Sequence, residues 1–290
     1  MHVFVAGATG AVGRLVVPLL LDGGHQVTGI SRSAAGVERV RRQGAAAVQA
    51  DAFDPEALAE VVAGAAPDAV IQQLTDLGDA DAEATDRLRR EGTRNLVAAA
   101  KAAGVPRIVV QSLCWAYMPG DDPADETVPL DTGAAPPRAG LVDGVEAMEA
   151  AAADLETGVL LRYGILYGPG TWYAPGGQAA AALAGDPGAR FIGTVQADES
   201  VISFLHVADA ARAAVAALDW PSGPVNIVDD EPARSREWVP VLAAALGVPA
   251  PEPTAGRQTW ARGASNALAR SRGWRPEYPT WRTGFAAQGA

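Results

Sequence analysis

The first residues suited to chemistry are glycines at a fixed spacing. Gly7, Gly10 and Gly13 lie in GATGAVG, between an apolar run and a helical pattern. Glycine at these positions permits a tight turn and a close approach of the backbone to a pyrophosphate, which then faces the positive end of the following helix. The spacing therefore predicts a dinucleotide-binding turn. The other residues expected to line it are Thr9, Ala11 and Val12.

Residues after the second and third apolar runs predict which dinucleotide is bound. Many NAD enzymes place an acid after the second strand for the ribose hydroxyls, whereas this chain has Arg32 in GISRS. A guanidinium pairs bidentately with a 2'-phosphate, so NADP(H) is favoured over NAD(H). Arg14 either adds a phosphate contact or is solvated. Asp51, beside Ala52, either contacts the adenine amino group or caps the next helix, a role that Asp54 fills equally well.

These residues are spaced along a regular alternation of short apolar runs and helical patterns. The alternation predicts an α/β fold, a Rossmann doubly wound parallel sheet whose carboxyl edge forms the binding site. Strands are expected near residues 2–6, 26–31, 46–50, 68–74, 107–112 and 158–163, and helices near 11–22, 34–43, 55–64, 80–103 and 140–156.

The amino-acid composition of the chain changes after residue 164. Gly, Pro and aromatic residues in GPGTWYAPGG are followed by the short strand or helix candidates FIGTV, VISFLHV, PVNIV and SREWVPVLAAALG. We expect residues 1–164 to form an NADP-binding domain and residues 165–290 a smaller C-terminal substrate-binding lobe, the two interleaved as one structural unit. The Pro- and Asp-rich residues 119–137 predict a long loop.

Composition excludes several kinds of partner. The net charge of −11 over 290 residues disfavours nucleic acid. Cys114 is the only cysteine, so an intrachain disulfide and a cysteine-based zinc cluster are excluded, and no metal is expected. The chain shows neither a signal-peptide pattern nor an apolar run of about 18 residues. We expect a cytoplasmic protein, monomer or homodimer, with a small-molecule substrate and no membrane contact.

Several motifs, in order, resemble one enzyme family. EGTRNLVAAAKAAGVPRIVVQS resembles the fourth helix and fifth strand of the extended and atypical short-chain dehydrogenase/reductases, the NAD-dependent epimerase/dehydratase group. LRYGILYGPG resembles their LRPGNVYGPG, and FLHVADAARA resembles their FIHVDDVARA. PVNIVDDEP and GWRPEYPTWRTGF resemble two late segments, so the match covers nearly the whole chain. The resemblance implies further cofactor contacts at Gln73, Leu74, Arg162 and Gly164.

The resemblance breaks at the catalytic pair of that family. Its tyrosine and lysine occur as YxxxKxxxE at the start of the fifth helix. With Glu149 as the trailing acid, Leu141 and Val145 occupy the two positions. The preceding serine or threonine of the family falls on Leu113, and a helical asparagine of some members falls near Arg89. In the usual mechanism the tyrosine moves the proton and the lysine lowers its pKa, so this chain needs another proton source.

Other side chains are candidates for that role. Lys101, the only lysine, lies near the end of the fourth helix, where its charge suits the helix dipole. Ser112 ends the fifth strand, Tyr117 lies in the following loop, and Tyr163 replaces a proline of the family. Each of these three is either a catalytic group or a packing and hydrogen-bonding residue. His206 belongs to the framework motif FLHV, so a structural role is expected.

Aromatic side chains cluster in two segments predicted at the carboxyl edge of the sheet. Flat aromatic walls suit a planar ligand. The alternative is ordinary anchoring of loops. Four of these residues are expected to contact substrate: Trp115, Tyr167, Trp172 and Tyr173.

Three functions are consistent with these features. The leading hypothesis is an NADPH-dependent ketoreductase acting on an aromatic or polyketide-like ketone, with a proton from substrate or water. Among atypical members of the family, a reductase that tailors angucycline-type antibiotics fits the combination. The alternatives are a non-catalytic NADP-binding sensor or regulator, and a sugar or lactone epimerase/dehydratase with an acid/base pair such as Asp143 and Glu146.

Overall fold

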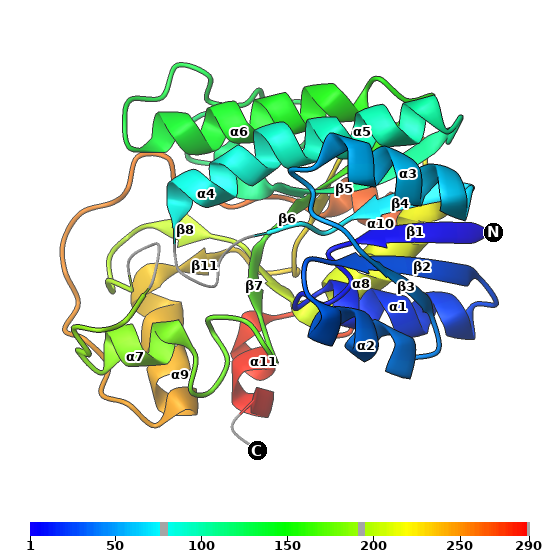
Figure 1. Cartoon of the computed structure of the whole chain (residues 1–290). Helices are drawn as coiled ribbons and strands as arrows, with labels where there is room; N and C mark the ends of the chain where they lie inside the picture. Colours follow the sequence, from blue (N-terminus) through cyan, green and yellow to red (C-terminus); the bar gives the residue numbers. More distant parts are fainter. Residues whose placement is uncertain (76–80, 191–194, 289–290) are drawn as a thin grey trace.

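The computed structural model describes residues 1–75, 81–190 and 195–288. Its centre is a sheet of seven parallel strands in the order β10-β6-β5-β4-β1-β2-β3 (Figure 1). Near-continuous apolar strands such as Val3–Ala6 are buried on both faces, as parallel sheets require. The strands are β1 (His2–Ala6), β2 (Gln26–Ser31), β3 (Ala46–Gln49), β4 (Ala69–Gln72), β5 (Arg107–Leu113), β6 (Thr157–Tyr163) and β10 (Gly223–Ile227).

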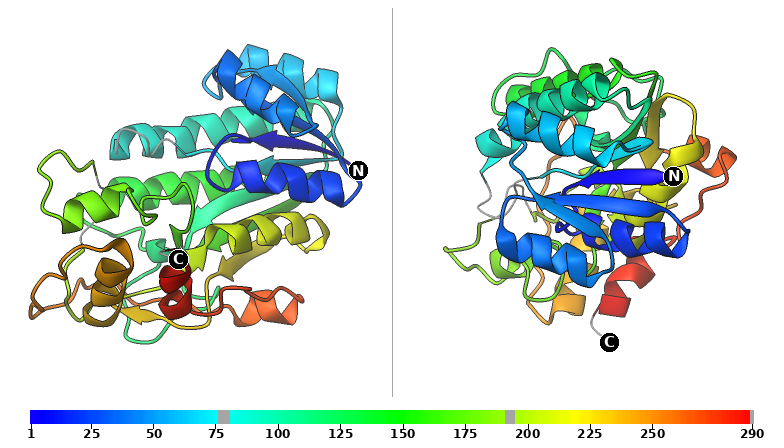
Figure 2. Two further views of the ribbon diagram at one scale, coloured as in Figure 1. Left: turned by 90° about the horizontal axis from the view of Figure 1, so that it is seen from below. Right: turned by 45° about the vertical axis from the view of Figure 1, so that its right-hand side comes forward.

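Helices cover both faces of this sheet, which confirms the doubly wound arrangement (Figures 1 and 2). One face carries α3 (Pro55–Ala65), α5 (Thr93–Ala102) and α6 (Arg138–Ala152), and the other carries α1 (Gly13–Asp22), α2 (Ala34–Arg42) and α8 (Val207–Ala216). Within the described ranges, every helix is too short or too polar to span a bilayer.

A smaller lobe lies beyond the carboxyl ends of the strands, on the side away from the N-terminus (Figure 2). Its own apolar core includes Phe204, Trp238 and Trp281. Two short strand pairs link it: β7 runs parallel to β9, and β11 runs antiparallel to β8. The elements are β7 (Ile165–Tyr167), β8 (Val201–Ile202), β9 (Phe204–His206), β11 (Ala233–Arg234), α7 (Gln178–Leu183), α9 (Ser235–Leu246), α10 (Ala267–Ser271) and α11 (Trp281–Gln288).

The structure differs from expectation in two segments. The long helix expected near 80–103 is described as α4 (Ala82–Arg87), a π-helical turn over Leu88–Gly92, and α5. The π-helical turn is closely packed at its end, because a Cβ added to Gly92 would be 2.7 Å from a Leu88 methyl and 3.3 Å from Ala52. PVNIV, expected in the smaller lobe, instead forms β10 of the main sheet. Most of FIGTV lies outside the described residues.

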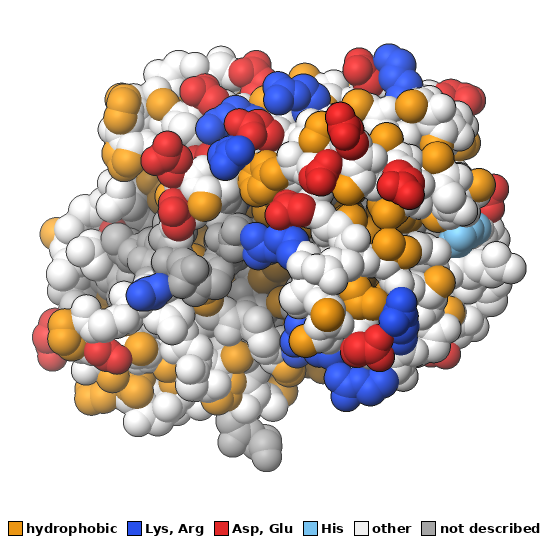
Figure 3. All heavy atoms as spheres, viewed as in Figure 1, with side chains coloured by type: hydrophobic (Ala, Val, Ile, Leu, Met, Phe, Trp, Pro, Cys, Tyr) orange, Lys and Arg blue, Asp and Glu red, His pale blue; other side chains and the backbone are white. Residues whose placement is uncertain are grey.

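Charged side chains are mixed on the face shown in Figure 3, which is hollowed near its centre. Acidic and basic groups alternate over the upper helices. Basic groups gather at the lower right over α2, whose last turn carries Arg39, Arg41 and Arg42. The charged side chains are therefore distributed unevenly over this face, although the net charge of the chain is −11.

Candidate functional site

The glycine turn lies where the strand order reverses, between β1 and β4. Gly7 has φ +87°, and an added Cβ there would lie 2.3 Å from the carbonyl oxygen of Gln73. A Cβ on Gly13 would lie 2.1 Å from the carbonyl oxygen of Gly7. Gly10 is different, because it is exposed and its Cβ would meet only the Gly7 oxygen at 3.4 Å. Two glycines therefore close the turn, and the third keeps its outer side open to a ligand.

Helix α1 starts directly after this turn without a side-chain cap. Its first amides can therefore point at an anion, and the helix dipole favours negative charge there. Thr9 and Ala11 are partly exposed beside Gly10, whereas Val12 is buried under the turn. The cradle fits the pyrophosphate of a dinucleotide.

The residues expected around the adenosine half lie along the same edge. Arg32 follows β2 and is exposed, and its carbonyl oxygen accepts a hydrogen bond from the Gln49 side-chain amide at 3.1 Å. Asp51 is also exposed, and its carboxylate accepts a hydrogen bond from the Phe53 amide at 3.0 Å. The cap of α3 is Asp54, which accepts from Ala57. Asp51 is therefore not the helix cap.

Arg14 contacts the loop that follows β7. Its guanidinium donates to the carbonyl oxygen of Pro169, and a Cβ on Gly170 would be 2.6 Å from the same guanidinium. Gln43 donates to the Arg14 carbonyl oxygen at 2.8 Å. In this structure Arg14 thus joins the glycine turn to the loop after β7.

The ends of β3, β4 and β6 carry the other predicted cofactor residues. Ala52 is buried, and its carbonyl oxygen accepts a hydrogen bond from Asn95 at 3.0 Å. The backbone amide of Gln73 donates to Ala6 at 2.8 Å, which locks it beside the glycine turn. Leu74 is partly exposed next to it, and Gly164 is buried after β6, where a Cβ would be 2.8 Å from the Ser203 oxygen.

Ser112 is buried in a charged network at the end of β5. Its hydroxyl donates to Oε1 of Glu149 at 2.5 Å. Arg162 donates to the same carboxylate twice, from Nε to Oε1 at 2.9 Å and from Nη2 to Oε2 at 2.6 Å. Burial alone would lower the pKa of Arg162, but the hydrogen bonds and charge of Glu149 raise it above its ordinary value. Arg162 thus forms a buried ion pair with Glu149.

Tyr117 and Tyr163 are also buried and hydrogen-bonded. The Tyr117 hydroxyl donates to Oδ1 of Asn226 at 2.6 Å, and its ring lies 4.7 Å from the Arg162 guanidinium carbon. The Tyr163 hydroxyl donates to the Ala210 oxygen at 3.3 Å and accepts from Gln73 at 3.3 Å. Burial raises the pKa of both phenols above the ordinary value. Both hydroxyls are therefore neutral, and both donate a hydrogen bond within the protein.

The positions aligned with the family's tyrosine and lysine lie in apolar surroundings. Val145 is fully buried and packs with Leu113 and Ala116, and Leu141 lies against the same cluster. Lys101 lies in the last turn of α5, and its ammonium lies 3.8 Å from Asp154, with both side chains mostly exposed. Because α5 ends where β5 begins, Lys101 lies at the opposite edge of the sheet from Ser112.

Other acid/base candidates are either exposed on a helix or held in the framework. Asp143 and Glu146 are exposed on α6. His206 caps α8 through Nδ1, which accepts from Ala208 at 3.3 Å, and its ring stacks on Tyr278 with centroids 3.6 Å apart. Burial lowers the pKa of His206 to about 4, so its imidazole is neutral at pH 7.

The aromatic residues expected to bind substrate fall into two groups. Tyr167 and Tyr173 are buried in the core of the smaller lobe, where Tyr167 contacts Phe285 edge to face at 4.9 Å. Trp115 and Trp172 are partly exposed. The clustering of aromatic residues in the sequence does not distinguish a residue of the apolar core from one in the wall of a binding site, because both kinds of position favour large aromatic side chains.

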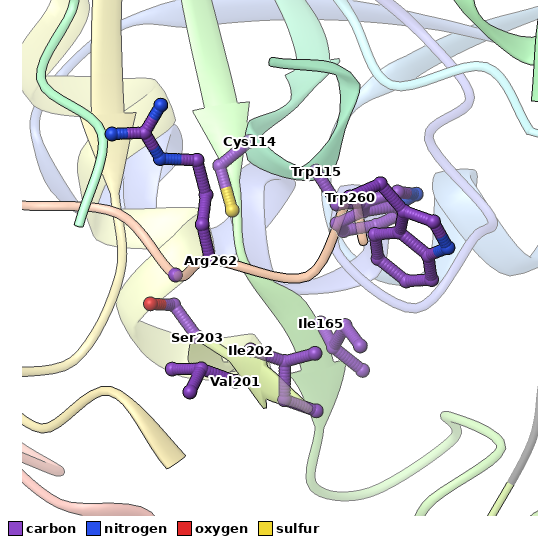
Figure 4. A pocket seen from close by; sticks show the side chains of 9 residues that line it. Cys114, Trp115, Ile165, Val201, Ile202, Ser203, Trp260 and Arg262 are labelled. Atoms are coloured by element: carbon purple, nitrogen blue, oxygen red, sulfur yellow. The ribbon is translucent and has the colours of Figure 1, made fainter. Parts of the chain in front are cut away.

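A small pocket opens beside the end of β5 (Figure 4). Cys114 points its sulfur toward the pocket centre, and two indoles, Trp115 and Trp260, form one side. Sequence reasoning missed Trp260, which lies in a Pro- and Gly-rich stretch far along the chain from the resembling LRYGILYGPG motif. The only signal was a large aromatic residue within a loop. The full lining is Cys114, Trp115, Ile165, Val201, Ile202, Ser203, Trp260, Arg262 and Gly263.

Comparisons with known proteins show what the chain is similar to. A protein-family profile described as NAD(P)H-binding matches residues 7–219. The chain is 42% identical to the 3-diazoavenalumate denitrifying reductase of a Streptomyces species, over 99% of this chain and 100% of that protein.

Solved structures share the fold. The UDP-glucose 4-epimerase of Thermus thermophilus, in complex with NAD, has a TM-score of 0.77 at 23% identity, covering 100% of this chain and 98% of that chain. The dTDP-glucose 4,6-dehydratase of Streptomyces venezuelae, with NAD bound, has a TM-score of 0.78 at 21% identity, covering 100% and 96%. At these identities the likeness shows the fold alone.

Proposed function

The chain belongs to the NAD(P)H-binding family, and from that premise we propose that it is an NADPH-dependent reductase that replaces an aromatic diazo group by hydrogen and releases dinitrogen. The proposal is supported by 42% identity, over nearly the whole of both chains, to a reductase named for a diazo substrate and for denitrification. The fold is that of the epimerase/dehydratase-like short-chain dehydrogenases.

The observation that carries the proposal is that Ser112, Tyr117 and Tyr163 are all buried and hydrogen-bonded. When bound, the reduced cofactor supplies a hydride. Reduction of a ketone needs a proton as well, and a positioned side chain usually provides it. An aromatic diazonium carbon needs none: the C–H bond forms, the C–N bond breaks, and its electron pair leaves with dinitrogen. The cation charge passes to the oxidised cofactor, so atoms and charge balance.

Each part of the site has a role in this reaction. The glycine turn and the first turn of α1 hold the pyrophosphate, and Arg32 pairs with the 2'-phosphate, which favours NADPH. Val145, Leu113 and Ala116 form an apolar cluster beside the end of β5, at the positions where the sequence resemblance places the catalytic pair of the family. An apolar wall excludes water, and water would otherwise attack an aryl diazonium carbon and convert it to a phenol.

Isotope-labelled cofactor tests this function. Purified protein is incubated with an ortho-diazophenol bearing a conjugated acid side chain and with NADPH carrying deuterium at C4. We expect one dinitrogen and one NADP⁺ per turnover, and deuterium on the ring carbon that carried nitrogen. Nitrogen loss at an equal rate without NADPH, or without the protein, would refute the proposal.

A second candidate is reduction of an aromatic ketone, with the proton taken from water or from a hydroxyl of the substrate. The partly exposed indoles of Trp115 and Trp260 favour a flat substrate of either kind. A panel of polycyclic ketones and quinones, assayed with the same labelled NADPH, separates the two. Turnover of ketones but not of the diazophenol would select this second function. Cofactor binding without turnover of any substrate would select an NADP-binding sensor.

A further inference from the structure

The pocket at the end of β5 has one aromatic side and one aliphatic side (Figure 4). Trp115 and Trp260 make the aromatic side, although they are 145 positions apart in the chain. Ile165 and Ile202 lie below the indoles in Figure 4 and belong to the aliphatic side. Cys114 directly follows β5 and Ile165 begins β7, just after β6. The pocket therefore adjoins the carboxyl ends of β5 and β6, where ligands of doubly wound sheets bind.

Trp260 is held by an arginine from another part of the chain. The guanidinium carbon of Arg138 lies 5.3 Å from the centroid of the Trp260 ring. Arg138 is itself fixed, because it pairs with Asp131 at 3.0 Å and donates to the Tyr117 carbonyl oxygen at 3.0 Å. A guanidinium over one face of an indole is a favourable cation–π contact. This contact gives Trp260 a defined place while the pocket is closed, even though Trp260 lies in a loop.

The rest of the lining is poor in reactive groups. Ser203 donates to the Ala264 oxygen at 3.4 Å and accepts from the Ala264 amide at 2.9 Å. Burial raises the pKa of Cys114 to about 12, so its thiol is neutral and weakly nucleophilic at pH 7. Apart from the two indoles, the lining therefore presents no thiolate, phenolate or amine to an electrophilic aromatic ring.

We propose that Trp115 and Trp260 are the stacking platform for the aromatic ring of the substrate, that Arg138 positions Trp260, and that the substrate is a flat, conjugated arene. The proposal rests on the proposed function for the reaction at that ring. It adds a substrate class and two residues, Arg138 and Trp260, from outside the glycine turn and the catalytic positions.

Binding must move one wall of the pocket. The enclosed space is about 10 Å³, room for roughly one water molecule and far too small for an aromatic ring. Trp260 is the side chain able to swing, because it lies in a turn at Thr259–Trp260 between segments without helix or strand. On either side of that turn, Arg257 donates to the Gly120 oxygen at 2.5 Å and Arg262 to the Asp122 oxygen at 2.7 Å. A ring that displaces Trp260 outward then stacks on it.

Calorimetry with two shape-matched acids tests the platform. Protein saturated with NADP⁺ is titrated with 4-hydroxycinnamate and with its analogue that has a saturated cyclohexane ring. We expect the aromatic acid to bind roughly 10-fold more tightly, because only a flat ring gains the stacking contacts with the two indoles. Trp260→Ala should remove most of this preference, Trp260→Phe should keep most of it, and Arg138→Gln should reduce it with Arg138→Lys restoring part.

Trp220 offers a matched control. It also lies under an arginine, with the Arg272 guanidinium carbon 5.7 Å from its ring, but at the opposite edge of the sheet near the start of β5. Trp220→Phe and Arg272→Gln should leave the preference unchanged. If Trp260→Ala behaves like Trp220→Phe, or if wild type binds both acids equally, the platform is overturned.

These measurements involve no turnover, so they separate the two proposals. A preference that depends on Trp260, in a protein that fails to release dinitrogen from the diazophenol, retains the aromatic site and rejects the diazo reaction. Dinitrogen release by a protein without that preference retains the reaction and rejects the platform. Unfolding midpoints of all variants, measured in parallel, must match wild type within a few degrees for a change in binding to count.

Discussion

Glu149 binds Arg162 through two hydrogen bonds, Nε to Oε1 at 2.9 Å and Nη2 to Oε2 at 2.6 Å, and both residues are buried. The pair joins α6 to β6, and Ser112 of β5 donates to the same carboxylate. Three elements are thus tied together at the carboxyl edge of the sheet. The pair holds the framework beneath the site through Nε and Nη2 of Arg162, whereas its buried Nη1 has no hydrogen-bond partner.

Removing one partner of this pair should destabilise the protein strongly. Glu149→Gln leaves the buried Arg162 cation without its counter-charge, which costs about 3 to 5 kcal/mol. Urea unfolding measures the loss. Glu146→Gln is the control, since Glu146 is an exposed glutamate one turn earlier on the same helix and should change stability by less than about 0.5 kcal/mol. Equal effects of the two changes would contradict the assignment.

Loss of the buried hydroxyls should affect the hydride step little. If the acceptor needs no proton, Ser112→Ala, Tyr117→Phe and Tyr163→Phe each retain single-turnover rates within roughly 5-fold of wild type, whereas a general acid would contribute about 10² to 10⁴-fold. Stopped-flow absorbance of NADPH measures the rates. A drop beyond roughly 100-fold in one variant, with its stability unchanged, identifies that hydroxyl as a proton donor.

Arg32 should decide between NADPH and NADH. Arg32→Glu replaces a phosphate-pairing cation with a carboxylate, and loss of a charge-assisted contact of roughly 1.5 to 3 kcal/mol weakens NADPH binding by about 10- to 100-fold. The Kd of NADH should change much less. Arg39→Glu makes the same charge change on exposed α2 and serves as the control. A similar loss in both variants would point to the general field of the surface rather than to Arg32.

The glycines of the turn should separate folding from cofactor binding. Gly13→Ala places a methyl 2.1 Å from the Gly7 oxygen and should lower the unfolding temperature with or without NADPH. Gly10→Ala meets nothing closer than 3.4 Å and should fold normally. Its methyl then lies on the open side of the turn, so the stabilisation by NADPH should shrink. Thermal melts with and without cofactor show both effects, and an unaltered NADPH shift in Gly10→Ala would contradict the cradle.

His206 should make stability depend on pH. The folded-state pKa of about 4 lies below the ordinary 6.5, so folding favours the neutral ring. Its contribution is complete above the ordinary pKa and is lost as pH falls toward the folded-state value, by up to about 3 kcal/mol. His206→Asn keeps a side chain able to cap α8 but does not titrate. Urea unfolding at neutral pH and near the folded-state pKa should therefore show a smaller pH effect in the variant, and equal slopes would exclude His206.

Sequence patterns located the sheet well because its strands are buried on both faces and read as unbroken apolar runs. The expected ranges 2–6, 26–31 and 158–163 differ from β1, β2 and β6 by at most one residue at either end. The glycine turn was equally easy to predict from the sequence, because the backbone is too crowded at Gly7 and Gly13 for any side chain.

Side-chain burial and long-range contacts could not be predicted in the same way. Tyr167 and Tyr173 have several aromatic neighbours, yet nothing local in YGPGTWYAPGG predicts that they face a core. Trp260 reaches the pocket through tertiary contacts with Arg138, which is distant in the chain. Such pairings depend on how the smaller lobe folds back over the sheet, which hydrophobic periodicity does not encode.

Strand β10 has a consequence for how the chain is built. It pairs with β6 along Gly223–Ile227, although the whole first part of the smaller lobe separates the two strands in sequence. During synthesis, β6 therefore emerges as an open edge with unpaired backbone groups, and an open edge invites pairing with other chains. The backbone of β6 is paired on that side only after residue 227 has been made, and β10 is then the edge strand of the sheet.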